Sequence, residues 1–299
     1  MSNNSFFCHF CNLCLGRACI GEMPGMGGVN ESQNFILNCS GWDKIPLNED
    51  IPVSEENLGI APVTGAVQNI GFKREEDFYF PYLSAAYEAG ISLCIGDGFP
   101  DEKLKLGLLA AQKLNTKVSS ILKPYPQKKL FERIDWVKDS SSSIGVDIDA
   151  YNIISMRNQA ELTKKTASDL KALRNYSKLP LVVKGVFTAE DVELCKKLKP
   201  EIIIVSNHGG RVQTNTGSTA EFLKVYADVL KSSCLELWVD GGIRKRRDIQ
   251  VALSLGAVKC LAARPFINVL CKNIAEGKDG VKGMVFEIKR ILKKNAKIE

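Results

Sequence analysis

The sequence predicts a (β/α)₈ TIM barrel over residues 58–299, with a cysteine-rich extension over residues 1–57 and a C-terminal helix. Three observations carry this prediction: eight short apolar runs, helical spacing between them, and polar side chains directly after them. Several runs are apolar at consecutive positions, which is typical of parallel strands covered on both faces. The runs are residues 59–61, 92–95, 118–122, 144–146, 181–183, 202–205, 237–239 and 260–262.

The intervals between the runs are long enough for crossover helices. Helical spacing is clear over residues 104–114, 128–138, 189–198, 220–230 and 247–255. A last helix is predicted over residues 279–297, where an apolar stripe would dock on the barrel. An open doubly wound sheet is the alternative, but that fold usually has a glycine-rich phosphate loop after its first strand, and the first unit here has none.

The composition is that of an ordinary globular protein, with 45% hydrophobic and 25% charged residues among 299. The net charge of +6 gathers near the C-terminus, and no basic stretch is interleaved with aromatic residues as in nucleic-acid-binding proteins. No apolar stretch approaches the roughly 20 residues of a membrane span, and the N-terminus has no feature of a signal peptide. The ten cysteines then predict a reducing, cytoplasmic location. We expect a small-molecule partner, no nucleic acid and no integral membrane segment.

Polar functional groups follow five of the runs at the points where this fold has its catalytic loops. Asp147 follows the fourth run, Lys184 ends the fifth, and residues 206–211 follow the sixth. Residues 240–244 follow the seventh run, and Arg264 follows the eighth. Because the carboxyl ends of parallel strands meet at one end of a barrel, we expect these groups to share one site.

The loops after the seventh and eighth runs indicate a phosphate site. Gly241 and Gly242 let the backbone approach an anion closely and present N–H groups to it. Arg244 and Arg264 supply positive charge and planar donors. A plain turn with surface arginines is the alternative for either loop alone, and the two loops together favour the phosphate site.

His208 is the only histidine in the predicted barrel, and it stands between Asn207 and a glycine pair. An imidazole titrates near neutral pH, which suits proton transfer. Arg211 could hold a carboxylate through two parallel hydrogen bonds. A structural role is the alternative for a lone histidine.

Together these segments resemble the FMN-dependent 2-hydroxy acid oxidases and dehydrogenases, the family of glycolate oxidase and lactate oxidase. The matching segments are residues 181–186, 205–211 and 240–244, with a weaker match at residues 263–265. The resemblance implies a barrel that binds FMN and oxidises a small, lactate-like L-2-hydroxy acid to the 2-keto acid. Because family members are often tetramers, it also implies a possible homo-oligomer.

The resemblance implies roles for individual residues. Lys184 would lie near flavin N1 and stabilise the negative charge of reduced flavin, and Ser206 would bond to the flavin. His208 would be the base, taking either the hydroxyl proton or the α-carbon proton, and Asp147 would support it as its cation forms. Arg211 would bind the substrate carboxylate. The ribityl chain and the phosphate would be held by Asp240, Gly241, Gly242, Arg244, Ala263 and Arg264.

The first half of the barrel matches the family less closely. Ala61 and Pro62 lie in a segment similar to the one that passes the flavin ring after the first strand. Tyr125 could contact the substrate, and Lys123 stands in place of a flavin-binding amide. Other departures are Ala263 and Arg246 in place of glycines, Thr214 in place of an aspartate, and Gly145 in place of a threonine.

Two alternative functions stay open. The departures motivate a degenerate FMN-binding barrel without turnover. An FMN barrel of another reaction, such as type 2 isopentenyl diphosphate isomerase, is the second alternative. The pair of His208 and Arg211 argues against the isomerase, because a diphosphate substrate does not need this arrangement for a carboxylate.

The N-terminal extension contains four closely spaced cysteines. Cys8, Cys11, Cys14 and Cys19 have the spacing C-x₂-C-x₂-C-x₄-C, which could hold Zn²⁺ or an iron–sulfur cluster. Free thiols in an arm of the chain are the alternative. The other cysteines lie in apolar or helical stretches and are interpreted as core residues: Cys39, Cys94, Cys195, Cys234, Cys260 and Cys271.

Overall fold

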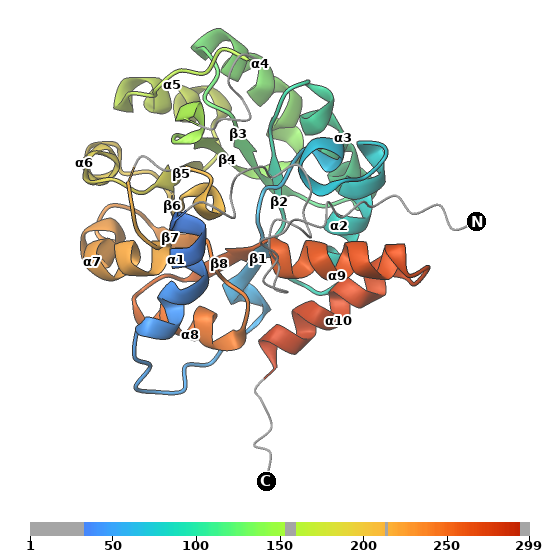
Figure 1. Cartoon of the computed structure of the whole chain (residues 1–299). Coiled ribbons are helices and arrows are strands. Elements are labelled where there is room, and N and C mark those ends of the chain that lie inside the picture. Colours follow the sequence, from blue (N-terminus) through green and yellow to red (C-terminus); the bar gives the residue numbers. More distant parts are fainter. Residues whose placement is uncertain (1–32, 153–159, 213–214, 294–299) are drawn as a thin grey trace.

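The computed structural model, which describes residues 33–152, 160–212 and 215–293, contains eight parallel strands enclosed by helices (Figure 1). The strands are β1 (Leu58–Ile60), β2 (Cys94–Gly96), β3 (Val118–Leu122), β4 (Ser141–Asp147), β5 (Leu181–Val186), β6 (Ile202–Val205), β7 (Glu236–Asp240) and β8 (Lys259–Ala262). They neighbour one another in the order β1-β8-β7-β6-β5-β4-β3-β2. Each predicted run overlaps one of these strands.

The barrel closes between β1 and the segment that leads into β2. Gly59 pairs with Ser92 in an isolated parallel bridge. The Ile60 N–H donates to Ser92 O at 2.9 Å, and the Ser92 N–H donates to Leu58 O at 3.0 Å. The sheet is therefore a nearly closed barrel, and the predicted fold class is confirmed.

Helices cover the outside of the barrel in sequence order (Figure 1). They are α2 (Glu76–Glu88), α3 (Glu102–Lys113), α4 (Gln127–Val137), α5 (Ala167–Ser177), α6 (Ala189–Leu198), α7 (Thr219–Lys231), α8 (Arg246–Ser254), α9 (Arg264–Ala275) and α10 (Gly280–Leu292). Each predicted helical stretch overlaps a helix of the structure, and the last one corresponds to α10. The sequence analysis set no bounds for α2, α5 and α9. None of the helices in the described ranges is long and apolar enough to cross a lipid bilayer.

Capping residues determine where several of these helices begin. A Ser or Thr side chain accepts the N–H of an acidic residue three positions on, whose carboxylate accepts the cap's own N–H. This reciprocal arrangement starts α5 at Thr166 with Asp169, α6 at Thr188 with Asp191, and α7 at Ser218 with Glu221. The local sequence thus determines the residue at which each of these three loops ends and the next helix begins.

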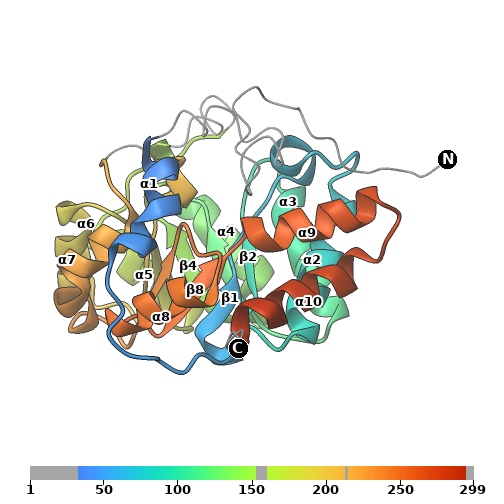
Figure 2. The same ribbon diagram turned by 60° about the horizontal axis from the view of Figure 1, so that its bottom comes forward.

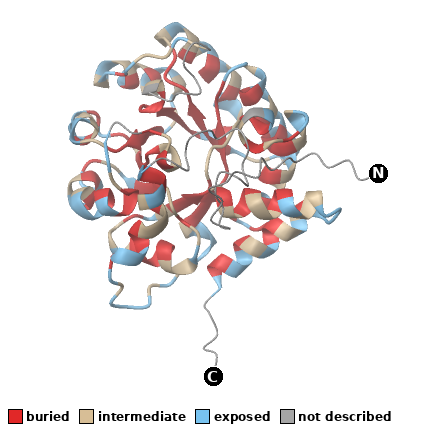
Figure 3. Cartoon of the chain, in the orientation of Figure 1, coloured by how far each residue is buried: buried red, intermediate tan, exposed pale blue. Residues whose placement is uncertain are grey.

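Most of the core falls into two clusters, and the strands are buried almost throughout (Figure 3). The larger part packs between the strands and the surrounding helices. The smaller part fills the inside of the barrel with Cys94, Ile121, Val182, Ile202, Ile204, Trp238 and Leu261. Gly145 faces this interior, and a Cβ on it would lie 2.6 Å from Val182 Cβ and 2.8 Å from Ile121 Cδ1. Glycine replaces the family's threonine there because large neighbours already fill the space.

The extension contains a helix near its end, which the sequence analysis did not predict. Residues Gln33–Gly41 form α1, which lies across the end of the barrel where the strands finish (Figures 1 and 2). Asn38 Nδ2 donates to Asn207 Oδ1 at 2.7 Å, and Trp42 Nε1 donates to Gly241 O at 2.9 Å. The predicted division of the chain at residue 57 stays a prediction, but α1 and the barrel loops pack as one structure.

The four N-terminal cysteines, Cys8, Cys11, Cys14 and Cys19, lie outside the described residues. The other cysteines have free thiols. Cys94, Cys195, Cys260 and Cys271 are buried, as predicted for core residues, whereas Cys39 and Cys234 are partly exposed.

Candidate active site

A cavity opens at the carboxyl ends of the strands, with about 990 Å³ of space that includes the part open to solvent. It is the end of a (β/α)₈ barrel where binding sites lie. Most of the predicted site residues line it: Ala61, Pro62, Lys184, His208, Arg211, Asp240, Gly241, Gly242, Arg244, Ala263 and Arg264. Lys123, Thr64 and Asn69 line it as well.

His208 reaches the cavity from a strained turn directly after β6. Its φ of +53° lies in the left-handed region, which is rare for a residue other than glycine and is typical of functional sites. The His208 N–H donates to Ser206 Oγ at 3.2 Å, and Asn207 Oδ1 accepts the Gly210 N–H at 2.9 Å. These two bonds hold the backbone that turns the imidazole toward the cavity.

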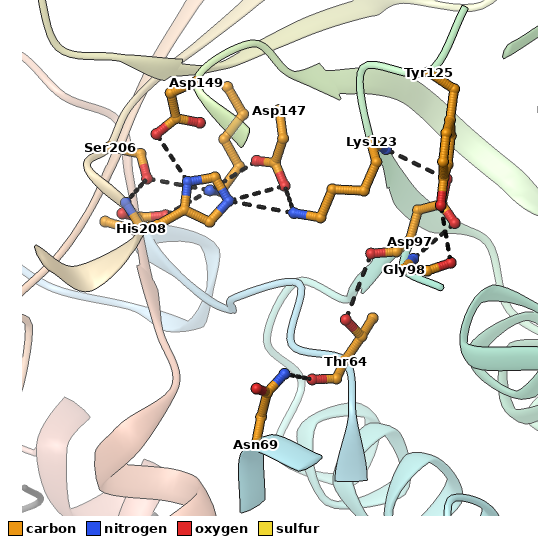
Figure 4. A network of polar contacts seen from close by, with 12 residues as sticks. Thr64, Asn69, Asp97, Gly98, Lys123, Tyr125, Asp147, Asp149, Ser206 and His208 are labelled. Atoms are coloured by element: carbon orange, nitrogen blue, oxygen red, sulfur yellow. Dashed lines mark hydrogen bonds and ion pairs between the residues drawn. The ribbon is translucent and has the colours of Figure 1, made fainter. Parts of the chain in front are cut away.

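Carboxylates contact both nitrogens of this imidazole (Figure 4). His208 Nδ1 lies 2.8 Å from Asp149 Oδ2, and Nε2 lies 3.1 Å from Asp147 Oδ2. The contact with Asp147 was predicted from the resemblance, whereas Asp149 was not assigned a role. Its position offered a signal, because side chains two residues apart in extended chain point to the same side.

Two lysines surround Asp147 on its other sides. Lys123 Nζ lies 2.7 Å from Asp147 Oδ2 and 3.4 Å from His208 Nε2. Lys184 Nζ lies 3.0 Å from Asp147 Oδ1, 3.4 Å from Asp240 Oδ2 and 3.1 Å from Ser206 Oγ.

These contacts keep the buried groups charged. Burial alone would raise the pKa of Asp147, but His208, Lys123 and Lys184 hold it well below its usual range. Burial alone would lower the pKa of Lys184, but the carboxylates of Asp147, Asp240 and Asp149 raise it above its usual value. Asp147 is therefore an anion and Lys184 a cation at neutral pH.

The same carboxylates and imidazole could in principle hold a metal ion, because ligand atoms of Asp147, Asp149 and His208 lie within 4.8 Å of one another. The ammonium groups of Lys123 and Lys184 already contact both oxygens of Asp147. A divalent cation would have to displace these ammonium groups or lie beside them. We therefore assign proton chemistry, and not a metal, to this cluster.

Arg264 lines the cavity beside the turn that carries His208. Its side chain lies over the Phe35 ring, 4.7 Å from the centroid, and its terminal nitrogens lie 3.3 and 3.4 Å from Gly209 O. Its Nε has no hydrogen-bond partner among the described residues, although Arg264 is only 9% exposed. Burial, together with the positive charges of Arg244 and Arg211, lowers the pKa of Arg264 to about 9. A bound anion would remove this unfavourable concentration of positive charge.

The N-terminus of α9 adds to the same part of the cavity. The helix starts at Arg264 and runs for 12 residues. Its first N–H groups and its dipole favour an anion beside Ala263 and Arg264. Asp240, across the cavity, has an Oδ1 with no hydrogen-bond partner in the described part of the chain. An anionic group and a hydroxyl donor would complete these contacts.

The glycine pair after β7 has a second purpose that the sequence did not show. Gly241 and Gly242 have φ values of +91° and +81°. A Cβ on Gly242 would collide with Asn38 O of α1, and one on Gly241 would lie 2.8 Å from Thr219 Oγ1. The loop is therefore restricted to glycine by the docking of α1, in addition to any need for close approach to a ligand.

Three predicted site residues do not line the cavity. Asp147 and Ser206 lie behind its wall, where they contact His208 and Lys184. Tyr125 is 1% exposed, and its hydroxyl donates to Gly98 O at 3.1 Å (Figure 4). This arrangement gives no support to the predicted contact between Tyr125 and a substrate.

Comparison with known proteins identifies the family of this chain. The family model described as FMN-dependent dehydrogenase matches residues 109–296. Similar curated proteins include 2-hydroxyacid oxidase 2 of Rattus norvegicus, 37% identical over 116 residues that make up 38% of this chain and 31% of the relative. Glycolate oxidase 1 of Oryza sativa subsp. indica is 32% identical over 178 residues, 59% of this chain and 45% of the relative. The matched regions thus span about a third to a half of these relatives.

Solved structures share the fold over almost the whole chain. A mandelate oxidase with benzoyl-formic acid has a TM-score of 0.68 and 21% identity, covering 93% of this chain and 90% of that structure. A mandelate oxidase mutant with the C4a-OH-FMN adduct has a TM-score of 0.69 and 21% identity, covering 94% and 92%. The structural likeness establishes the barrel, and the family model covers more than half of the chain. The chain therefore belongs to the FMN-dependent dehydrogenase family.

Proposed function

We propose that this member of the FMN-dependent dehydrogenase family binds FMN in the cavity and oxidises a small, lactate-like L-2-hydroxy acid to the 2-keto acid. One observation carries the proposal. A histidine and three arginines line the same cavity: His208, Arg211, Arg244 and Arg264. A base thus faces the same space as groups that can bind a carboxylate and a phosphate.

The residues present fit FMN. The unpartnered Nε of Arg264, the α9 N-terminus and the left-handed glycines suit its phosphate, and the free Oδ1 of Asp240 suits a ribityl hydroxyl. Ala61 and Pro62 line the wall on the side of β1, where the flavin ring would pass. Lys184, held as a cation, suits the negative charge that develops on the ring. When bound, FMN supplies the acceptor for the two electrons that leave the substrate.

The chain's own residues would bind the acid and move one proton. Arg211 binds the substrate carboxylate through its planar donors and orients the hydroxyl-bearing carbon toward His208. His208 Nε2 accepts the proton that the substrate loses, either from the hydroxyl or from the α-carbon. Asp147, kept ionised by its cationic neighbours, then balances the positive charge of the imidazolium at 3.1 Å. Ser206 holds the backbone N–H of His208 and the ammonium of Lys184, and so acts behind the wall.

Lysine at position 123 is the observation that favours a second candidate function. Its ammonium lies on the cavity wall beside His208, where the family has an amide. A barrel that binds FMN without oxidising ordinary hydroxy acids would follow if this charge interferes with the base or with substrate binding. The isomerase alternative gains no support, because the carboxylate-binding arrangement of His208 and Arg211 is intact.

One experiment separates these outcomes. The purified protein is analysed for FMN and mixed under anaerobic conditions with lactate, glycolate and mandelate. Bleaching of the flavin by one of these acids, lost in His208→Ala and retained in the control His9→Gln, supports the proposal. Colour that no acid bleaches supports the second candidate, and failure to bind added FMN contradicts both.

Some predictions for the rest of the chain accompany this proposal. Zn²⁺ or an iron–sulfur cluster at Cys8, Cys11, Cys14 and Cys19 would offer an acceptor for electrons from the flavin, and would favour a dehydrogenase over an oxidase. Metal analysis of protein purified without oxygen tests it, and finding neither Zn nor Fe contradicts it. The homo-oligomer and the cytoplasmic location stay predictions from the sequence.

A further inference from the structure

The two carboxylates beside His208 have different surroundings. Asp149 Oδ2 contacts Nδ1 at 2.8 Å, and this is the one ion pair within 4 Å that the described residues give to the Asp149 carboxylate. Asp147 contacts Nε2 at 3.1 Å but also contacts Lys123 at 2.7 Å and Lys184 at 3.0 Å. The negative charge of Asp147 is therefore shared among several cations, whereas that of Asp149 is directed at the imidazole.

These distances decide where the imidazole proton lies in the resting state. With a proton on Nδ1, His208 donates to Asp149 at 2.8 Å. Nε2 is then a lone-pair acceptor, and the Lys123 ammonium, 3.4 Å away, can turn an N–H toward it. Either neutral tautomer leaves one bare nitrogen beside a carboxylate, Nδ1 at 2.8 Å from Asp149 or Nε2 at 3.1 Å from Asp147. Only at Nε2 does an ammonium group, that of Lys123, also lie close enough to donate to the bare nitrogen. The geometry favours the Nδ1–H form.

The backbone is shaped to accommodate Asp149. The Ile148 N–H donates to Lys184 O at 2.8 Å, which extends the pairing of β4 with β5 by one residue past Asp147. At the next position of β5, Gly185 has a φ of +93°, and a Cβ there would collide with the Asp149 carboxylate. β5 also shifts register between Lys184 and Val186. The Asp149 carboxylate thus occupies a site that only a glycine opposite it permits.

We propose that Asp149, and not Asp147, is the residue that positions His208 and fixes its Nδ1–H tautomer. This inference deepens the proposed function, because the tautomer leaves Nε2 as the base that faces the cavity. Asp149 acts through His208 and does not contact the substrate, so it is a positioning residue. Asp147 has the complementary part, because it accepts the new N–H when His208 is protonated.

The proton and charge balance is simple. The proton that the substrate loses forms a bond to Nε2, while the Nδ1–H bond to Asp149 is retained throughout. The resulting imidazolium donates from Nδ1 to Asp149 and from Nε2 to Asp147, and Lys123 keeps its contact with the same Asp147 oxygen. If His208 takes the hydroxyl proton, the O–H electron pair would form the carbonyl bond and the α-hydrogen would leave with the two C–H electrons to FMN. If His208 takes the α-proton, the C–H electron pair would pass to FMN and the hydroxyl proton would follow it. FMN, which the proposed function supplies, is the oxidant in either case.

The histidine content of the chain makes this inference directly testable. The chain has two histidines, so the variant His9→Gln leaves His208 as the only one. Nitrogen-15 NMR of histidine-labelled protein then shows which ring nitrogen carries the proton. At pH 8 we expect a protonated Nδ1 and a bare Nε2. A proton on Nε2 alone, or on both nitrogens, would overturn the proposal without the need for any further variant.

Asp149→Asn tests the consequence for chemistry. We expect the proton to move to Nε2, because the new amide can donate to Nδ1, and the rate of anaerobic flavin reduction to fall by about 10³-fold or more. KM should change little, because Asp149 makes no contact with the substrate. If the tautomer of Asp149→Asn equals that of the parent while Asp147→Asn changes it, Asp147 is the positioning residue and the proposal is wrong.

Asp191→Asn is the matched control. Asp191 is a partly buried carboxylate at the start of α6, but it accepts N–H bonds from Phe187 and Thr188 and does not contact the imidazole. Its loss should lower thermal stability and leave the proton of His208 on Nδ1. The NMR measurement reports on the imidazole and not on turnover. It therefore decides the role of Asp149 even if the protein proves to oxidise no hydroxy acid.

Discussion

Replacing Arg264 by methionine should weaken binding of FMN but not of riboflavin, because the two ligands differ only in the phosphate. Arg264 would give the phosphate charged hydrogen bonds, each worth about 1.5–3 kcal/mol. A loss of that size lowers FMN affinity by about 10- to 150-fold. Without ligand, the variant removes a buried cation whose Nε has no partner among the described residues, but it also loses the stacking on Phe35. These effects oppose each other, so the free energy of unfolding of the free protein should change by no more than about 1 kcal/mol.

Fluorescence titration with FMN and with riboflavin measures the two affinities, and thermal melting of the free protein measures its stability. The ratio of FMN to riboflavin affinity should fall by the full factor, whereas riboflavin affinity should change less than about threefold. Arg174→Met is the control, because Arg174 contacts Glu201 and the backbone carbonyls of Leu198 and Lys199 and does not line the cavity. It should lower stability and leave the ratio unchanged. Equal losses for both ligands in Arg264→Met would refute the assignment of the phosphate to this arginine.

Three further predictions concern the turns and charges around the cavity. Gly242→Ala should lower the free energy of unfolding by about 2–5 kcal/mol in chemical denaturation, because its Cβ would collide with Asn38 O. Gly277→Ala, with a φ of +70° and open space around it, should cost only about 1 kcal/mol, and equal effects would contradict this account. Asp147→Asn should destabilise the protein at pH 7 by about 3 kcal/mol, because two buried ammonium groups lose their partner. The pKa of Asp147 is lowered in the fold, so its stabilising effect is present above about pH 4 and is lost as the pH falls through the lower folded-state value. The difference in denaturant midpoint between the two proteins should therefore shrink on acidification, and a constant difference from pH 7 to pH 3 would argue against it. Lys123→Gln removes a cation 3.4 Å from the imidazole. The acidic limb of the pH profile of flavin reduction should therefore move to higher pH by about one unit. No movement, or movement to lower pH, would show that the charge of Lys123 does not act on the base.

The barrel could be predicted from the sequence because each of its strands overlaps a short apolar run and polar functional groups follow five of the eight runs. The runs at residues 202–205 and 118–122 coincide with β6 and β3, and the α6 boundaries agree with the predicted residues 189–198. Period and composition carry that information locally. By contrast, α1 could not be predicted, because its apolar residues Phe35, Ile36 and Leu37 are consecutive and show no helical spacing. The side chains of Asn34 and Asn38 hold the helix in place by bonding to distant loops. Such long-range polar contacts leave no periodic pattern in the sequence.

Some residues of the candidate site could likewise be identified from the sequence, and others could not. Residues that follow strands, such as His208 and Lys184, were identified because the fold brings strand ends together. The role of Asp149 was missed because it depends on the left-handed backbone of Gly185, which makes room for its carboxylate. The contact of Lys123 with Asp147 was missed because it depends on how a long flexible side chain packs, and neither charge reveals its partner in the sequence.

The departures from the family pattern do not have equal weight, and their places in the structure show why. Arg246 points away from the cavity and donates to Val53 O and Leu292 O, so it fastens the last helix to the segment before β1. Ala263 has a φ of −126°, where alanine is unstrained, and it lines the cavity with only one additional methyl group. Gly145 lies in the barrel interior, where the side chains of Ile121 and Val182 leave no room for a Cβ.

Lys123 is different, because it places a full positive charge on the cavity wall within 3.4 Å of the imidazole and draws on the carboxylate that the family pairs with its base. A second carboxylate at the other ring nitrogen compensates for that change. We therefore interpret Lys123 and Asp149 as two linked changes around the same imidazole. If Asp149 compensates for the presence of Lys123, the double variant Lys123→Gln and Asp149→Asn should reduce flavin faster than Asp149→Asn alone. The reason is that Asp147, no longer paired with Lys123, can support the imidazolium. A double variant no faster than Asp149→Asn would show that the two positions act independently.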